Sequence, residues 1–291
     1  AYRMVWREAD ERLRSALIAS DGTTLRGPIM LADRAHSDFS FIALDEQNAL
    51  ALWINPVTQR ANAAILDLEG RPVRAEISLP SESLEWLAAC VDPSSGNLHL
   101  AWITAGTGDT WNLTTQIIPQ DDTPTPAPQP VITFSLPRGE ALTGLMIGRD
   151  RSHAYVFWST LTIDVPDTER VYWLSFPHNQ PDQAVLNELT LENAPGLQNG
   201  DSPNALRWPR LATENDQRLA LALSARFEAN WRPAVVFFNA GEIERTSIAA
   251  DQNADAAPPA LTWIDTQNLI LVFSGNKDTI PHLYSTSLTI P

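Results

Sequence analysis

The chain has 291 residues, of which 44% are hydrophobic, and 35 acidic against 20 basic residues give a formal charge of −15 at pH 7. A surface this acidic repels phosphate backbones and anionic lipid, so we expect no nucleic-acid partner and no membrane insertion. The single cysteine, Cys90, excludes an intrachain disulfide and a cysteine-based zinc site. Carbohydrate and protein ligands remain open.

Short apolar runs, most of them ending in an aromatic residue, recur along the chain. They are MVW at 4–6, ALALW at 49–53, LHLAW at 98–102, AYVFW at 154–158, LALALS at 219–224 and LILVF at 269–273. Runs of this length, bounded by turn residues, indicate strands. The stretch READERLRSAL at 7–17 could pass for an amphipathic helix, but its alignment with the next repeat predicts a loop followed by a strand.

An acidic residue opens a polar turn before each run except the first: Asp45, Asp92, Asp150, Glu214 and Asp265. Within 38–79, the segments 38–44, 49–53, 61–68 and 73–79 have strand character and are separated by turns. The stretch 16–31 also matches 64–79, with Gly22 aligned on Gly70. Four strands at a period of about 40–50 residues are typical of a β-propeller blade.

The repeats predict an all-β fold, a single β-propeller domain over 1–291. We count six blades of four antiparallel strands, with five or seven as alternatives. Their approximate bounds are 1–34, 35–80, 81–137, 138–196, 197–250 and 251–291. Five prolines within 119–130 predict a protruding loop between the third and fourth strands of the third blade.

Two segments, GNLHLAW at 96–102 and HLYSTSL at 282–288, resemble the repeats of sialidase-type propellers. The Asp-box of that family is degenerate here, because 104–111 keeps Gly108 and Trp111 but has Gly106 in the place of the aspartate. The resemblance implies a carbohydrate-active propeller. The arginine cluster and the Tyr/Glu pair of the family do not map onto this sequence, so no catalytic residue is assigned.

Aligning the blades on their turn acids places Asp38, Glu85 and Arg207 at one repeat position, where the first strand begins. Trp208 follows Arg207, and the loops after the second strands, on the same face, add Asp109 and Glu228. Aromatic rings and carboxylates together suit a sugar, so we predict that these side chains share one polar opening. The alternative is that acids fall on every face of so acidic a chain and that the tryptophans only pack between blades.

The sequence has no phosphate-binding loop, dinucleotide fingerprint, nucleophile elbow or zincin motif, so no cofactor and no metal is predicted. We therefore expect a non-enzymatic binding or interaction module with a carbohydrate or protein ligand. An extracytoplasmic or secreted setting within a larger protein is expected, and no signal sequence is expected in this stretch. The alternatives are a glycoside hydrolase or lyase acting at the channel mouth, and a purely structural scaffold.

Overall fold

The computed structural model describes residues 2–36, 38–73, 79–80, 82–92, 94–120, 124–162, 169–178, 180–191, 203, 205–214, 218–228, 230–248, 257–265, 267–277 and 280–289. Their regular structure is β-strand, with one short 3₁₀ helix at Pro181–Gln183. No helix in these ranges is long and apolar enough to cross a membrane. The chain divides into two compact units, residues 1–135 and residues 136–291.

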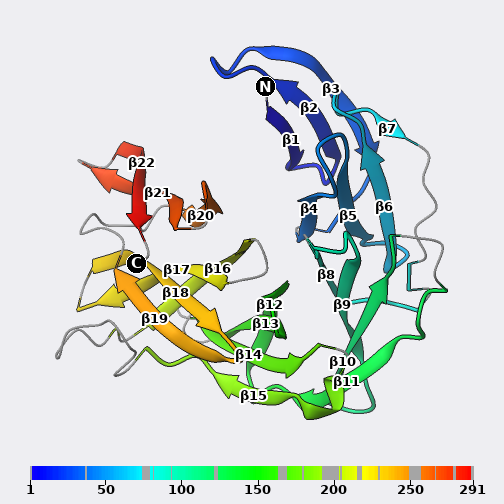
Figure 1. The fold of residues 1–291 in the computed structure, drawn as a ribbon, viewed down its shortest axis with the longest axis vertical. Helices are drawn as coiled ribbons and strands as arrows, with labels where there is room; N and C mark the ends of the chain where they lie inside the picture. Colours follow the sequence, from blue (N-terminus) through cyan, green and yellow to red (C-terminus); the bar gives the residue numbers. More distant parts are fainter. Residues whose placement is uncertain are drawn as a thin grey trace. The chain divides into compact units, whose positions relative to one another are not determined.

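The first unit consists of three antiparallel sheets in which each strand pairs with the next in sequence (Figure 1). The first sheet contains β1–β3, with bounds Tyr2–Arg7, Leu13–Ile18 and Thr24–Ala32. The second contains β4–β7, with bounds Phe39–Ala43, Ala49–Asn55, Arg60–Leu66 and Pro72–Val73. The third contains β8–β11, with bounds Trp86–Val91, Leu98–Ala105, Thr110–Ile118 and Gln129–Ser135.

The second unit repeats the same meander. One set contains β12–β15, with bounds Glu140–Arg149, His153–Thr162, Glu169–Pro177 and Val185–Glu188. The next contains β16–β19, with bounds Ala205–Glu214, Arg218–Phe227, Asn230–Asn239 and Glu242–Ile248. A single pair, Glu169 with Leu206, links the two sets into an eight-stranded sheet. The last sheet contains β20–β22, with bounds Ala257–Trp263, Asn268–Lys277 and Ile280–Thr289.

Successive antiparallel meanders of this kind are the blades of a propeller, and the predicted all-β, β-propeller fold class is confirmed. Within 7–17, β1 ends at Arg7 and a turn then leads into β2 at Leu13, so the segment is a loop followed by a strand, as the repeat alignment predicts. The predicted loop at 119–130 is wrong at its end, because residues 129 and 130 belong to β11.

The second strand of each four-stranded set is buried on both faces, and β5 shows how. Leu50, Leu52 and Ile54 lie in one apolar cluster with Leu100 and Trp102 of the next sheet. The alternate residues Ala51 and Trp53 lie in another cluster with Leu13 of the preceding sheet. Side chains alternate between the two faces of a strand, so a continuous apolar run such as ALALW fills two interfaces at once.

The strand β17 has the same arrangement in the second unit. Leu221 and Leu223 pack with Phe157 of the preceding sheet. Ala220 and Ala222 pack with Leu271 and Phe273 of the following one. Each fully buried leucine contributes about 1.5–3 kcal/mol. A sheet without its neighbours would expose both clusters, so the blades stabilise one another.

The turn acids are structural. Oδ1 of Asp45 accepts hydrogen bonds from the backbone N–H groups two and three residues later, at 2.6 and 2.8 Å. Asp265 accepts the equivalent pair at 2.8 and 2.9 Å, and Asp150 at 2.7 and 2.7 Å. Asp92 accepts them at 2.8 and 3.3 Å. A short carboxylate that closes the turn between the first and second strands explains why aspartate recurs there.

Asp150 also joins two neighbouring sheets. Its Oδ2 accepts hydrogen bonds from the hydroxyl of Tyr155 and, at 2.8 Å, from the N–H of Ala240 in the turn between β18 and β19. The Tyr155 hydroxyl in turn accepts one from the N–H of Gly241, at 2.8 Å. Burial by itself would raise the pKa of Asp150, but the hydrogen bonds outweigh it and hold that pKa below its usual value.

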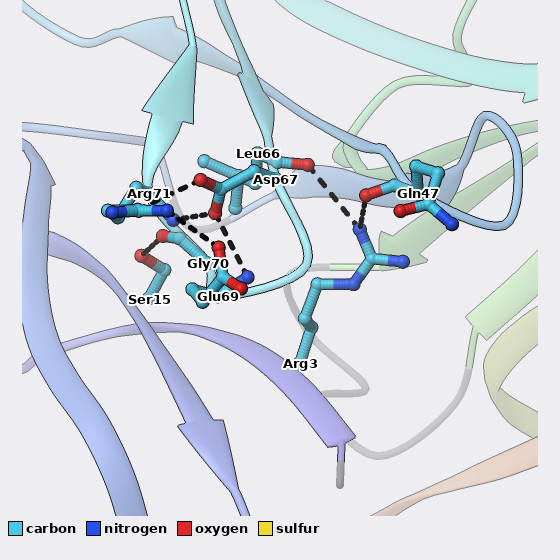
Figure 2. Close-up of polar contacts among 8 residues, drawn as sticks. All are labelled: Arg3, Ser15, Gln47, Leu66, Asp67, Glu69, Gly70 and Arg71. Carbon is cyan, nitrogen blue, oxygen red and sulfur yellow. Dashed lines mark hydrogen bonds and ion pairs between the residues drawn. The ribbon is translucent and has the colours of Figure 1, made fainter.

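A second polar link joins the first two sheets (Figure 2). The buried hydroxyl of Ser15 donates to the carbonyl of Gly70 at 2.8 Å. Arg3 donates to the carbonyls of Gln47 and Leu66, at 3.2 and 3.4 Å. Gly70 has a φ of +75°, as its repeat partner Gly22 has one of +85°. The repeated sequence therefore preserves a left-handed turn that suits glycine.

We predict that Asp150→Ala destabilises the protein by about 3 kcal/mol, because buried donors from two sheets lose a charged acceptor. Asp45→Ala is the matched control, since Asp45 closes an exposed turn and its described hydrogen bonds stay within that turn. Urea denaturation measures both. A loss for Asp150→Ala no larger than that of the control would contradict the inter-sheet role.

We predict that replacing residues 121–128 by a short Gly-Ser turn changes the melting temperature by no more than about 3 °C, because loop length has a weak entropic effect. The replacement retains Gln120, whose N–H donates to Asn97 at 3.1 Å, and all of β11. Differential scanning calorimetry measures the change. A larger drop would show that the segment packs on the sheets.

Candidate functional site

In each four-stranded sheet, the start of the first strand and the end of the second lie at the same end, which we call the rim. The pairs Phe39–Trp53, Trp86–Ile103 and Arg207–Ser224 define it. The turn acids lie at the opposite end. Asp38 and Glu85 directly precede β4 and β8, and Arg207 lies near the start of β16, so each is at the rim of its own sheet.

In residues 1–135, the rims of three successive sheets meet around His36. Its N–H donates to the carbonyl of Ile54 at 2.8 Å. Its ring meets the Trp86 ring edge-on, with centroids 5.1 Å apart and an interplanar angle of 84°. The N–H of Asp38 donates to the Nδ1 atom of His36 at 3.3 Å. His36 is therefore held between the entries to β4 and β8.

The turn after β1 adds two charges to this group. Arg7 donates from Nε to the carbonyl of Ala35 at 2.8 Å, and its Nη2 lies 3.4 Å from Oε1 of Glu11. Glu85, at the entry to β8, interacts electrostatically with His36. We call the resulting group the His36 cluster: Arg7, Glu11, His36, Asp38, Glu85 and Trp86.

The imidazole of His36 is kept neutral. Burial lowers the pKa of His36 most, and the positive charge of Arg7 lowers it further. The carboxylates of Glu85 and Glu11 oppose this, but the net effect is a pKa below the usual value. A neutral ring also leaves Nδ1 as the acceptor for the Asp38 N–H. The cluster therefore offers donors and acceptors together.

The rim of β16–β19 has a different chemistry, built on arginine and aromatic rings. The Arg207 side chain, 7% exposed, has its Cζ 3.9 Å from the centroid of the Trp231 ring. Arg226 lies over the same indole at 5.5 Å, and Arg232 lies over Phe227 at 5.5 Å. Cation–π contact fixes these guanidinium groups against apolar surface.

Glu140 is an acidic residue at the rim that the alignment of the blades did not identify. Its Oε2 accepts a hydrogen bond from Thr160 at 2.7 Å, and its Oε1 lies 3.5 Å from Nε of Arg170. The side chain is almost completely buried. Glu140 thus ties the first three strands of its sheet together and anchors an arginine.

The predicted site residues separate into two groups. Asp38 and Glu85 come together as neighbours of His36 in residues 1–135, whereas Arg207 lies in residues 136–291. Asp109 and Glu228 are exposed in the turns after β9 and β17. Trp208 lies in β16, but its side chain is outside the described part of the structure. One opening shared by all of them stays a prediction.

Sequence reasoning also missed His36 and Arg7. His36 has no counterpart at the aligned position of the other blades, and Arg7 comes from the sheet that precedes it. His36 lies two residues before Asp38, which the repeat alignment places at the start of the first strand. That nearness is the sequence signal that could have found it. Among the described residues, no group of three or more His, Cys, Asp or Glu side chains could hold a metal ion.

No protein-family model matches the chain, and no curated protein matches it significantly. Solved structures do resemble it. A mutant of AofleA from Arthrobotrys oligospora aligns with 99% of this chain and 83% of its own, at 12% identity and a TM-score of 0.54. The SapL1 lectin in complex with alpha methyl fucoside aligns with 99% and 92%, at 9% identity and a TM-score of 0.51. Polysaccharide lyase Uly1 aligns with 96% and 69%, at 9% identity and a TM-score of 0.51. Likeness at this level of identity shows a shared fold.

We predict that His36 makes the protein less stable as the pH falls below about 6.5, the pKa of an unfolded histidine. Just below that pH, the histidine of the unfolded chain binds a proton, whereas His36 in the folded cluster stays neutral. Acidification therefore favours unfolding. In His36→Gln this contribution is absent, and the difference in unfolding free energy between variant and wild type changes with pH. Urea denaturation at pH 7.5 and 5.5 measures it; parallel pH profiles would contradict the prediction.

Proposed function

We propose that this chain is a non-enzymatic propeller module that binds a neutral, hydroxyl-rich ligand, a carbohydrate, at the rim of residues 1–135. The observation that carries the proposal is the His36 cluster. It combines one guanidinium group, three carboxylates, a neutral imidazole and a half-buried indole at the meeting point of three sheets.

The charge of the cluster selects against anions. Arg7 supplies one positive charge against the carboxylates of Glu11, Asp38 and Glu85, and the whole chain carries −15. Carboxylates accept hydrogen bonds from hydroxyl groups, while Arg7 donates them. The Trp86 ring offers an apolar surface for the C–H face of a sugar. A hydroxylated neutral ligand uses all of these groups.

Binding without catalysis fits the described contacts better than hydrolysis. Glycoside hydrolysis requires two working carboxyl groups about 5–10 Å apart across the sugar. Within the His36 cluster, Glu11 faces Arg7, which is an anchoring role. A lectin that holds a fucoside among the similar folds supports the proposal, whereas the lyase keeps a carbohydrate-active enzyme as the alternative.

We also propose the domain organisation that the repeats indicate. The blades form a single propeller domain over 1–291, six in number, whose degenerate repeats resemble those of sialidases. An extracytoplasmic setting, where carbohydrate polymers are presented, suits such a module.

The test is a glycan array followed by isothermal titration calorimetry with the best glycan. We predict that Glu85→Gln and Trp86→Ala each weaken binding about tenfold or more, because one removes an acceptor charge and the other a stacking surface. Glu46→Gln is the control, since Glu46 is exposed at the opposite end of β4. Its affinity stays at the wild-type value.

Binding of no glycan, or equal affinities in all variants, would overturn the proposal. A reducing-sugar assay on the same glycan separates the alternative: release of reducing ends that disappears in Glu85→Gln would establish a hydrolase in place of a binding module.

A further inference from the structure

A pocket of about 540 Å³ opens in residues 136–291 at the end of the sheets opposite the rim. It lies between the sheet of β12–β15 and the turn that joins β18 to β19. Its lining includes His153, Trp173, Ser175, Asn187, Gly241 and Glu242. We propose that this pocket is a second ligand site, which takes one neutral polyhydroxylated unit of monosaccharide size. The proposal stands on the pocket alone and not on the His36 cluster.

The wall of the pocket is fixed by the link between the two sheets. Asp150 and Tyr155 of one sheet bond the N–H groups of Ala240 and Gly241 in the other. The hydroxyl of Ser175 donates to the carbonyl of Gly241 at 3.2 Å. A site held by a buried carboxylate and two hydroxyls is formed before any ligand arrives, which reduces the entropy lost on binding.

Gly241 is required at this wall. Its φ is +88°, and a Cβ atom there would lie 3.2 Å from the His153 ring and 3.4 Å from the Ser175 hydroxyl. The absence of a side chain lets the backbone of the β18–β19 turn approach both residues closely. The imidazole of His153 is oriented by the Ser152 hydroxyl, 2.8 Å from its Nδ1.

Trp173 contributes its indole to the lining of the pocket. The Trp173 side chain is 5% exposed, and among the described residues its Nε1 has no hydrogen-bond acceptor. Because the indole lines the pocket, its N–H signal reports on a ligand bound there. The half-buried amide of Asn187 and the exposed carboxylate of Glu242 add further donors and acceptors.

The size and charge of the pocket define the ligand class. A volume of about 540 Å³ falls within the ~300–1,000 Å³ of ordinary small-molecule sites. The described lining contains no arginine or lysine and one carboxylate, which disfavours phosphate and other anions. Amide, hydroxyl, imidazole and carboxylate groups around an indole match the mixed donors and acceptors of a polyol.

The unit 1–135 offers a natural control. A groove of about 410 Å³ occupies the equivalent place between β4–β7 and β8–β11, and polar as well as apolar side chains line it. Its polar residues Asp45 and Asn48 bond to each other, at 3.0 and 3.1 Å. Val73 on β7 and Val185 on β15 line the two pockets from equivalent fourth strands, and are 40% and 58% exposed.

The test follows the indole N–H signal of Trp173 and the amide signal of Gly241 by NMR while neutral methyl glycosides of the common hexoses and deoxyhexoses are added. We expect at least one glycoside to shift both signals saturably. Val185→Arg fills the pocket and weakens this binding about tenfold, whereas Val73→Arg and Glu85→Gln leave it unchanged.

Both valines are exposed, so neither substitution should disturb the core. Thermal melting followed by circular dichroism checks that both variants are folded before the titration. No shift of the Trp173 signal with any glycoside would overturn the second site. Equal affinity of Val185→Arg and wild type would overturn it as well. Loss of binding in Glu85→Gln but not in Val185→Arg would place the ligand at the His36 cluster alone.

Discussion

The structure depends on the burial of the second strands β5, β9, β13 and β17 on both of their faces. In β5 and β17, alternate side chains belong to different apolar clusters, one shared with the preceding sheet and one with the following sheet. The run must therefore be apolar at every position, and no sheet can satisfy it alone. The polar links of Asp150 with Ala240 and of Ser15 with Gly70 then fix how neighbouring sheets meet.

Because the second strands are buried, the side chains available to bind a ligand lie at the ends of the sheets. The interior strands are committed to packing, so charge and hydrogen-bonding variety gather at the rim and in the grooves opposite it. The two ends differ in kind. At one end the turn acids bond mainly to the backbone of their own turn, and Asp150 also reaches the next sheet, whereas the rim of residues 1–135 gathers charged side chains from three sheets. His36, Glu85 and Arg7 meet only because β1, β4 and β8 are packed in succession.

The sequence predicts the strands, the turns and the repeat position of the rim residues, because period-two patterning and aspartate turns are local signals. Asp38 and Glu85 were found in this way. The His36 cluster was not, since its members come from three sheets and no local pattern relates Arg7 to Trp86. Arg207 was predicted as a ligand residue in an open site, but it is buried against Trp231, a contact that depends on the register of β16 with β17 and of β17 with β18.

The central claim is that the His36 cluster binds a neutral, hydroxyl-rich ligand. A crystal structure of the chain with its best-binding glycan tests this most directly. We expect a sugar ring against Trp86, with hydroxyl groups bonded to the carboxylate of Glu85. A glycan that binds the chain without touching either residue would contradict it.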